Sequence, residues 1–306
     1  MGVKIQTFEG MVDKSRQFRA NMEGAPWKQF QYENSTITID VDGKITTEQG
    51  IFEPFPCQIT NAVVCGDSLI ATWVDHELRL ARMAKISLEN EIKNGITKAQ
   101  LRLNRNTAMV EGAIWCHILD AEPLALMAQG NKVFFALWSK GMYCIDSDAN
   151  EIWRLPLFDS EAKSPPRSEE VAAISTIRDE KIVVWSKGGK FREIDSNSGA
   201  ILNESKIEIE CDLEKVFNHE EIFLLSSKDG WAWEVRNSQV TVARKLRGTI
   251  QDAVFDNEDW RVISWREDIL MRGDSVERSE LGVQFVKYND LWHVLDNQGQ
   301  TSPHMG

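Results

Sequence analysis

The chain has 306 residues, of which 42% are hydrophobic and 27% are charged, and its formal net charge is -12. This composition is that of a globular protein long enough to bury a sizeable core. The acidic excess argues against general binding to nucleic acids or to an anionic membrane surface, because both require clustered lysine and arginine.

The first 30 residues do not share the pattern of the rest of the chain. Six residues recur at helical spacing before the sequence GAPW at 24–27: Phe8, Met11, Val12, Ser15, Phe18 and Met22. We predict an N-terminal extension over residues 1–30 with a short amphipathic helix. This helix either packs against the following domain or serves as a docking peptide. An apolar run of signal-peptide or membrane-spanning length is missing from the sequence, so we expect a cytoplasmic protein with no membrane partner.

Residues 31–306 consist of a repeated unit of short strands. VVWSKGGKFREI (183–194) aligns without a gap with LLSSKDGWAWEV (224–235), while ALWSKGMYCI (136–145) and VISWREDILM (262–271) align with changes in the turn. Runs of about five to eight residues rich in Val, Ile, Phe and Trp, bounded by Gly, Asn and Asp, predict β-strands. A unit of four strands, A to D, that recurs roughly every 40 to 50 residues is typical of a β-propeller blade.

The two ends of the chain indicate how the ring closes. STITIDVDGKITTEQG (35–50) has the form of strands C and D, because its IDVDGKI matches IDSDANEI (145–152) and IDSNSGAI (194–201). The last repeat offers only strands A and B. We therefore predict an all-β propeller of six four-stranded blades over residues 31–306, closed by pairing of the N-terminal C–D strands with the C-terminal A–B strands. Seven blades are the alternative, because the equivalent positions Trp73 and Trp138 are 65 residues apart.

Residues 85–106 fit either a long hairpin or a helix. Leu88, Ile92, Ile96, Ala99 and Leu103 recur at helical spacing, whereas Asn94–Gly95 is a strong signal for a two-residue hairpin turn. We favour a long C–D hairpin. Residues 105–123 would then be a long D–A connection or the remains of a further strand.

One repeat resembles the quinoprotein-like β-propellers. CIDSDANEIW (144–153) follows their pattern of an apolar residue, an aspartate and a later tryptophan, with Trp153 as the docking tryptophan. EIDSNSGAIL and TIDVDGKITT keep the aspartate and lack the tryptophan. The chain is therefore similar to β-propeller repeat proteins of the quinoprotein-like and WD40-like superfamily, with no specific family. This resemblance implies a rigid platform for partners and carries over no catalytic residue and no cofactor.

Four tryptophans share one repeat position at the end of strand B: Trp73, Trp138, Trp185 and Trp265. Large flat rings pack well between tilted blades, so we expect these four and Trp153 to be structural blade tryptophans. An exposed aromatic rim that contacts a ligand is the alternative.

Lys140, Lys187 and Lys228 fall in equivalent B–C turns, which share one face of a propeller with the D–A loops. They form either a basic arc for an acidic peptide or phosphate group, or solvated turns inherited from a duplicated ancestor. Trp115 and His117 belong to the long 105–123 connection, which we expect on the same working face. These five residues are the candidate partner-binding residues.

Neither catalysis nor metal binding is indicated. DSDANE (146–151) begins like a calcium loop but lacks the glycine and the final glutamate, and the five histidines are isolated. Cys116 and His117 are adjacent strand residues and point to opposite faces. The five cysteines are odd in number and scattered, which indicates reduced thiols rather than disulfides.

The sequence therefore favours a non-catalytic interaction scaffold that binds a protein or peptide through one propeller face, an acidic one if the lysines contribute. The alternative is an enzyme or small-ligand binder that uses the central channel. The oligomeric state is left open.

Overall fold

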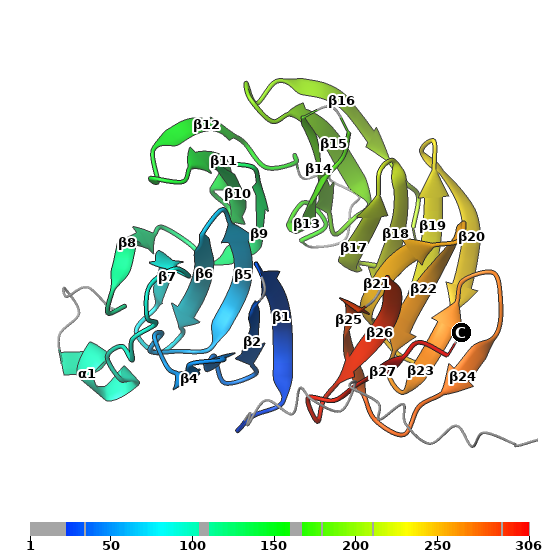
Figure 1. The fold of residues 1–306 in the computed structure, drawn as a ribbon. Helices are drawn as coiled ribbons and strands as arrows, with labels where there is room; N and C mark the ends of the chain where they lie inside the picture. Colours follow the sequence, from blue (N-terminus) through cyan, green and yellow to red (C-terminus); the bar gives the residue numbers. More distant parts are fainter. Residues whose placement is uncertain are drawn as a thin grey trace, which may run out of the picture.

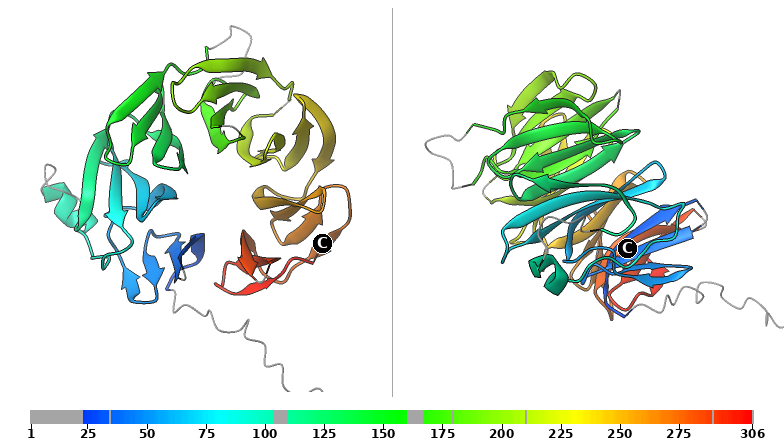
Figure 2. Two further views of the ribbon diagram at one scale, coloured as in Figure 1. Left: turned by 45° about the horizontal axis from the view of Figure 1, so that its top comes forward. Right: turned by 90° about the vertical axis from the view of Figure 1, so that its left-hand side faces the viewer.

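The strands form seven antiparallel sheets arranged as blades around a central axis (Figures 1 and 2). The computed structural model describes residues 23–33, 35–103, 110–159, 167–178, 180–209, 211–288 and 290–305. Six blades have four strands and the seventh has three. The first strands of neighbouring blades contact one another around the channel, so each blade runs from strand A at the centre to strand D at the rim.

The strands follow the order of the blades along the chain. Blade 1 comprises β1 (Pro26–Tyr32), β2 (Ser35–Asp40), β3 (Ile45–Thr47) and β4 (Gly50–Phe52); blade 2 comprises β5 (Ile59–Cys65), β6 (Ser68–Asp75), β7 (Leu80–Ser87) and β8 (Ala113–Leu119); blade 3 comprises β9 (Pro123–Gln129), β10 (Lys132–Leu137), β11 (Gly141–Asp146) and β12 (Glu151–Leu155). Blade 4 comprises β13 (Val171–Thr176), β14 (Lys181–Ser186), β15 (Lys190–Asp195) and β16 (Ile201–Lys206); blade 5 comprises β17 (Leu213–His219), β18 (Ile222–Ser227), β19 (Trp231–Arg236) and β20 (Gln239–Lys245). Blade 6 comprises β21 (Ile250–Asp256), β22 (Asp259–Ser264), β23 (Glu267–Leu270) and β24 (Ser275–Glu277); blade 7 comprises β25 (Gly282–Tyr288), β26 (Leu291–Asp296) and β27 (Thr301–Pro303).

The core is divided into layers between blades. Alternate residues of a strand point to opposite faces of its sheet, so each blade buries apolar side chains against both neighbours. Six buried apolar clusters result, one between each pair of consecutive blades from 1–2 to 6–7. Trp73 lies in the 1–2 cluster and Trp185 in the 4–5 cluster, both fully buried.

The ring closes differently from our prediction. The all-β propeller is confirmed, but it has seven blades, the alternative count, and blades 1 and 7 are separate sheets. The expected pairing of N-terminal C–D strands with C-terminal A–B strands is wrong, because β1 and β2 are strands A and B of a complete first blade. Instead, the side chain of Gln284 on β25 bonds the backbone of Gln29 on β1. Among the described residues, this 7–1 contact has no buried apolar cluster of its own.

The error has a physical reason in the shared aspartate turn. Asp146 Oδ1 accepts hydrogen bonds from the backbone nitrogens of residues i+2 and i+4 and closes a C–D turn. Asp40 and Asp296 accept the same two bonds but close B–C turns at the opposite end of their blades. A carboxylate that bonds its own turn stabilises any hairpin, so the motif does not tell which hairpin it belongs to.

The long segment in blade 2 is an insertion between strands C and D, which explains the 65-residue spacing without a further blade. Residues 98–103, expected to belong to a hairpin, form the short helix α1 (Lys98–Leu103), whose Leu101 is fully buried against the 1–2 cluster. Gly95 donates its backbone N–H to Glu53 O of blade 1 rather than closing a hairpin turn. Residues 113–119 of the expected connection form the outermost strand, β8.

Strand β1 begins at Pro26, inside the segment that we assigned to the N-terminal extension. The helix expected over Phe8–Met22 lies outside the described residues. Within the described part of the chain, no helix has the length and hydropathy needed to cross a membrane.

Candidate interaction face

The B–C hairpins of blades 3 and 4 align differently in the structure than the WSK motif indicates. Hairpin β10–β11 pairs Lys132 with Asp146, and hairpin β14–β15 pairs Lys181 with Asp195, so the two hairpins have equal length. Their gapless superposition places Trp138, not Lys140, opposite Lys187. The motif and the hairpin pairing therefore differ by two residues, so that Trp138 lies just beyond the end of β10, whereas Trp185 lies within β14. Trp138 is accordingly 46% exposed, whereas Trp185 is fully buried.

The exposed tryptophans gather on one face of the propeller. Of the eleven tryptophans in the chain, three are exposed: Trp138 (46%), Trp231 (37%) and Trp265 (58%). Each lies at the B–C turn of its blade, in blades 3, 5 and 6. Trp138 and Trp265 differ from our expectation of buried blade tryptophans, because each follows the end of strand B instead of lying within it.

The ring of Trp138 is held in place although it is exposed. Its indole Nε1 donates to Glu170 Oε1 at 3.0 Å, and Glu170 is only 4% exposed. Lys187 Nζ binds the other oxygen of Glu170 at 2.5 Å, and Arg167 lies 3.5 Å from the first. Lys187 is thus paired within the protein, and its charge is largely compensated.

The other two predicted lysines are available at the surface. Lys140 and Lys228 are exposed B–C turn residues, and within the described residues neither forms an ion pair. Near Lys228, the ammonium of Lys245 lies over the Trp231 ring at 5.4 Å from its centre. This face therefore combines exposed indole rings with uncompensated positive charge.

The opposite face carries exposed carboxylates. The A–B turns of six blades contain exposed carboxylates: Glu33, Asp67, Glu180, Glu220, Glu221, Glu258 and Asp290. The A strands surround the channel, so these turns place negative charge around its mouth on that side.

Trp115 and His117 do not join the B–C lysines. Both lie on β8 at the outer rim of blade 2, with ring centres 5.2 Å apart. Trp115 Nε1 donates to Ser147 O in the C–D turn of blade 3 at 3.0 Å. Trp153 Nε1 donates in the same way to Ser196 O in the C–D turn of blade 4 at 3.1 Å. Trp115 thus occupies in blade 2 the position of Trp153 in blade 3, which the insertion hides in the sequence.

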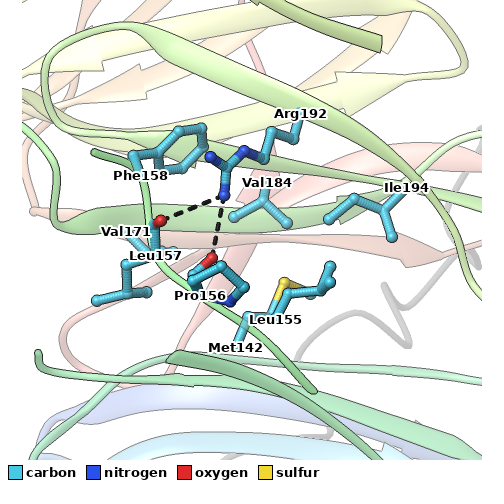
Figure 3. Close-up of a pocket in the computed structure, with 9 residues that line it drawn as sticks. All are labelled: Met142, Leu155, Pro156, Leu157, Phe158, Val171, Val184, Arg192 and Ile194. Carbon is cyan, nitrogen blue, oxygen red and sulfur yellow. Dashed lines mark hydrogen bonds between the residues drawn. The ribbon is translucent and has the colours of Figure 1, made fainter. Parts of the chain in front are cut away.

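An open cavity lies in the channel. It measures about 320 Å³ and is lined by residues of β9, β13, β17 and β21, among them Ser175, Thr176 and Asn218. A second cavity, between blades 3 and 4, has only about 10 Å³ (Figure 3). Arg192 covers it by donating to Pro156 O and Leu157 O, so this seam leaves no room for a ligand.

A belt of side chains joins the inner strands across blades 5, 6, 7, 1 and 2. Each belongs to the first paired residue after the bulge of its A strand, and each bonds the backbone of the next A strand. The bonds are Lys215 Nζ to Gln251 O, Phe285 N to Asp252 Oδ2, Gln29 N to Gln284 Oε1 with Gln284 Nε2 to Gln29 O, and Lys28 Nζ to Ala62 O. Burial raises the pKa of Asp252 to about 6, although its bonds to Phe285 and Ala253 oppose the shift.

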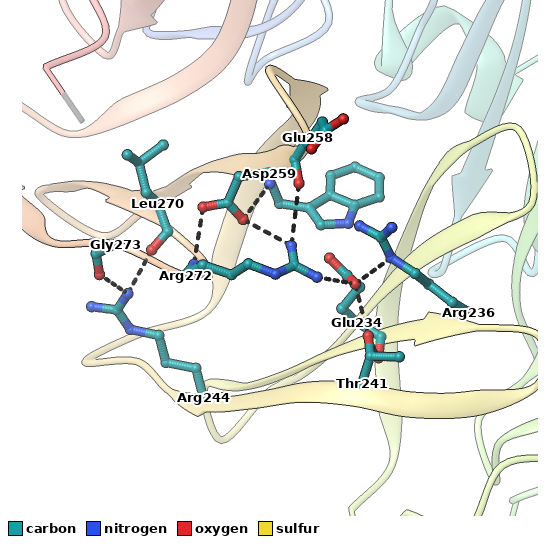
Figure 4. A network of polar contacts seen from close by, with 10 residues as sticks. Glu234, Arg236, Thr241, Arg244, Glu258, Asp259, Leu270, Arg272 and Gly273 are labelled. Atoms are coloured by element: carbon teal, nitrogen blue, oxygen red, sulfur yellow. Dashed lines mark hydrogen bonds and ion pairs between the residues drawn. The ribbon is translucent and has the colours of Figure 1, made fainter.

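A polar network ties blade 5 to blade 6 (Figure 4). Glu234 is fully buried, and its Oε1 accepts from Arg236, Arg272 and Thr241. Burial raises the pKa of Glu234, but these three bonds outweigh it and the pKa lies below its ordinary value. Arg272 also contacts Asp259, so the guanidinium is held between two carboxylates and holds the blades together.

Comparison with known proteins finds similarity in fold and none in sequence families. No protein-family model matches the chain, and no curated protein matches its sequence. The WD40 β-propeller domain of Doa1 is similar with a TM-score of 0.63 and 9% identity, covering 90% of this chain and 91% of that one. The β-propeller domain of Cps50 (Swd1) from Myceliophteria thermophila has a TM-score of 0.60 and 12% identity over 92% and 95%. BamB from Moraxella catarrhalis has a TM-score of 0.56 and 9% identity over 89% and 91%. In fold, the chain is a β-propeller like these. At such identities the likeness shows architecture alone.

Proposed function

We propose that this β-propeller is a non-catalytic cytoplasmic scaffold that binds an acidic protein or peptide through the face of its B–C turns. The observation that carries the proposal is the placement of Trp138, Trp231 and Trp265, the three exposed tryptophans, on this one face. Tryptophan is enriched among residues that dominate binding energy, because its large rigid ring buries much apolar area at low entropic cost.

The backbone at Trp265 supports the same reading. Its φ is +51°, in the left-handed region that glycine and asparagine adopt more readily. The side chain is 58% exposed, so it adds little packing to offset this cost. A bulky ring kept at a strained, exposed turn is better explained by contact with another molecule than by stability of the chain.

Charge complementarity indicates the kind of partner. Lys140 and Lys228 lie beside the tryptophans and are not neutralised by carboxylates of the described residues. In a chain of net charge -12, these two lysines offer an acidic partner local charge contacts. A peptide with acidic residues next to apolar ones matches this combination.

A displayed peptide library selected on the purified protein tests the proposal. We expect enrichment of sequences with Asp or Glu next to apolar residues. Binding should weaken by at least about tenfold in the W138A/W265A double variant, since central aromatic contacts dominate such interfaces. Leu291→Ala is the matched control, because Leu291 is 66% exposed at the A–B end of blade 7 and should leave binding unchanged.

Charge reversal at the two lysines tests their contribution to binding separately from that of the tryptophans. K140E/K228E should weaken binding and reduce its salt dependence, because fewer charge contacts remain to be screened. Selected peptides that bind W138A/W265A and K140E/K228E as tightly as the native protein would contradict the proposed face.

The cavity in the channel favours a second candidate, a small-ligand binder. Its volume of about 320 Å³ falls at the lower end of ligand pockets. A metabolite screen by thermal shift would support this candidate if a stabilising compound loses its effect in Asn218→Leu and keeps it in W138A/W265A. Stabilisation that is equal in both variants would exclude the cavity.

A further inference from the structure

Blade 2 contains a buried guanidinium without a carboxylate partner. Arg82 on β7 is only 2% exposed, and its Nη1 donates to Ala81 O at 3.2 Å. Its Nε is buried and has no hydrogen-bond partner, and among the described residues no carboxylate lies within ion-pair distance. A buried positive charge is costly unless an anion compensates it.

The thiol of Cys116 lies on the same side of the sheet. Strand β8 pairs Cys116 with Ala84 and Ile118 with Arg82, so Arg82 and Cys116 are diagonal neighbours on one face. Such neighbours lie roughly 7 Å apart at their backbones, within reach of a long side chain. Burial lowers the pKa of Arg82, and the charge of Cys116 is the influence that raises it. An arginine stays protonated at neutral pH even when buried.

We propose that Cys116 is a nucleophilic thiol, stabilised as its thiolate by Arg82, and that it is a site of reversible modification by hydroperoxides and other soft electrophiles. Cys116 is half-buried and forms no disulfide. In the reaction with hydrogen peroxide, the thiolate sulfur attacks one oxygen and the O–O bond breaks. The sulfur takes the OH group as a sulfenic acid, and the departing hydroxide accepts the proton of that acid to form water, so sulfur is oxidised to a sulfenate and the peroxide is reduced. The sulfenate keeps a negative charge next to Arg82.

The loop between blades 1 and 2 supplies a comparison thiol that faces a carboxylate. Cys57 is also half-buried, but its Sγ faces Asp75 Oδ2 at 3.8 Å. Burial, followed by the charge of Asp75, raises the pKa of Cys57 to about 11. Cys57 should therefore remain a thiol at neutral pH, so a difference between the two reports the neighbouring charge rather than exposure.

Alkylation of the native full-length protein by iodoacetamide, followed residue by residue by mass spectrometry, tests the proposal. At neutral pH, we expect Cys116 to react at least about tenfold faster than Cys57, since the thiolate is the reactive form. The Cys116 rate should rise with pH and reach its plateau by about pH 8, because the proposed pKa of this thiol is lower than that of an ordinary thiol. A Cys116 rate no higher than that of Cys57, or one that still rises above about pH 9, would overturn the proposal.

Substitution of Arg82 identifies the cause. Arg82→Lys keeps the charge and should preserve the rate, whereas Arg82→Met should slow Cys116 by about tenfold and leave Cys57 unchanged. If Arg82→Met does not fold, the pH profile of the native protein decides alone. Brief exposure to hydrogen peroxide with dimedone should label Cys116 before Cys57, and labelling of both at equal rates would contradict the oxidation step.

Discussion

The side-chain amide of Gln284 bonds the backbone of Gln29 in both directions: its Oε1 accepts from Gln29 N at 2.7 Å and its Nε2 donates to Gln29 O at 2.9 Å. These two residues are 255 positions apart and join the last blade to the first. The six other contacts between blades contain buried apolar clusters, whereas among the described residues this one does not. Among the described residues, the 7–1 contact is therefore held by polar bonds without a buried apolar cluster to support them.

Loss of the Gln284 amide should weaken the ring at this point. Gln284→Ala leaves both backbone groups of Gln29 unpaired, so we expect a loss of about 1 to 3 kcal/mol in the free energy of unfolding, measured with urea. Hydrogen exchange should rise first in β1 and β25. Gln29→Ala is the control, because it keeps the backbone groups and removes only a bond to Thr38. Equal losses in both variants would show that the amide bridge does not close the ring.

Asp252 should make stability depend on pH between about pH 4 and pH 6. Burial raises its pKa from 3.8 to about 6, so as the pH rises the folded state keeps a proton that the unfolded state has already released at lower pH. The stability conferred by this proton is therefore lost as the pH rises through that range, by up to about 3 kcal/mol. Asp252→Asn keeps a hydrogen-bond acceptor for Phe285 and lacks the titration. Chemical denaturation of both proteins should diverge across this range, and parallel pH curves would refute the assignment.

Gly199 should tolerate a side chain far less than Gly66. Both have positive φ, +75° and +59°, so alanine strains the backbone at each. A Cβ at Gly199 would lie 2.8 Å from the Trp153 ring, whereas a Cβ at Gly66 meets nothing within 4 Å. We expect Gly66→Ala to cost about 1 kcal/mol and Gly199→Ala roughly 2 kcal/mol more, as measured by thermal unfolding. Similar costs would mean that Trp153 can shift without loss.

The buried carboxylate of Glu234 should stabilise the 5–6 contact at neutral pH. Glu234→Gln removes the charge that Arg236 and Arg272 share, and we expect a loss of about 2 kcal/mol. Because the pKa of Glu234 in the folded state lies below its ordinary value, this contribution is present at neutral pH and disappears as the pH falls through the folded pKa. Glu204→Gln, which breaks the half-exposed pair with Arg192, should cost at most about 1 kcal/mol. Denaturant titrations at neutral and at acidic pH measure the free energy of unfolding of both variants. A loss in Glu234→Gln that is as large in acid as at neutral pH would contradict this account.

Several features of the fold are local and could be predicted. The strands of residues 181–195 and 222–236, their B–C turns and the role of Trp153 in its blade follow from alternation and turn chemistry within about 15 residues. Alternation of apolar and polar residues along a strand arises where one face of its sheet is buried. Every blade of the ring packs against its neighbours and so repeats this pattern. The propeller architecture is therefore encoded many times along the chain.

The register of the B–C turns was the first feature that the local pattern missed. The WSK motif aligned Trp138 with Trp185, but hairpin pairing places Trp138 two residues later, beyond the end of strand B and in solvent. Comparing the full length of the two hairpins is the signal that could have found it. The role of Trp115 was hidden by the insertion between its strand and strand C.

By itself, the sequence determined the all-β propeller and the composition of its strands and turns, because these depend on neighbours in the chain. Only the tertiary structure decided that there are seven blades, that Gln284 closes the ring on Gln29, and which tryptophans face solvent. The aspartate turn fits either end of a blade with equal ease, and a bond between residues 255 positions apart leaves no local pattern. These choices are made by packing between blades, where burial of one face excludes the alternatives.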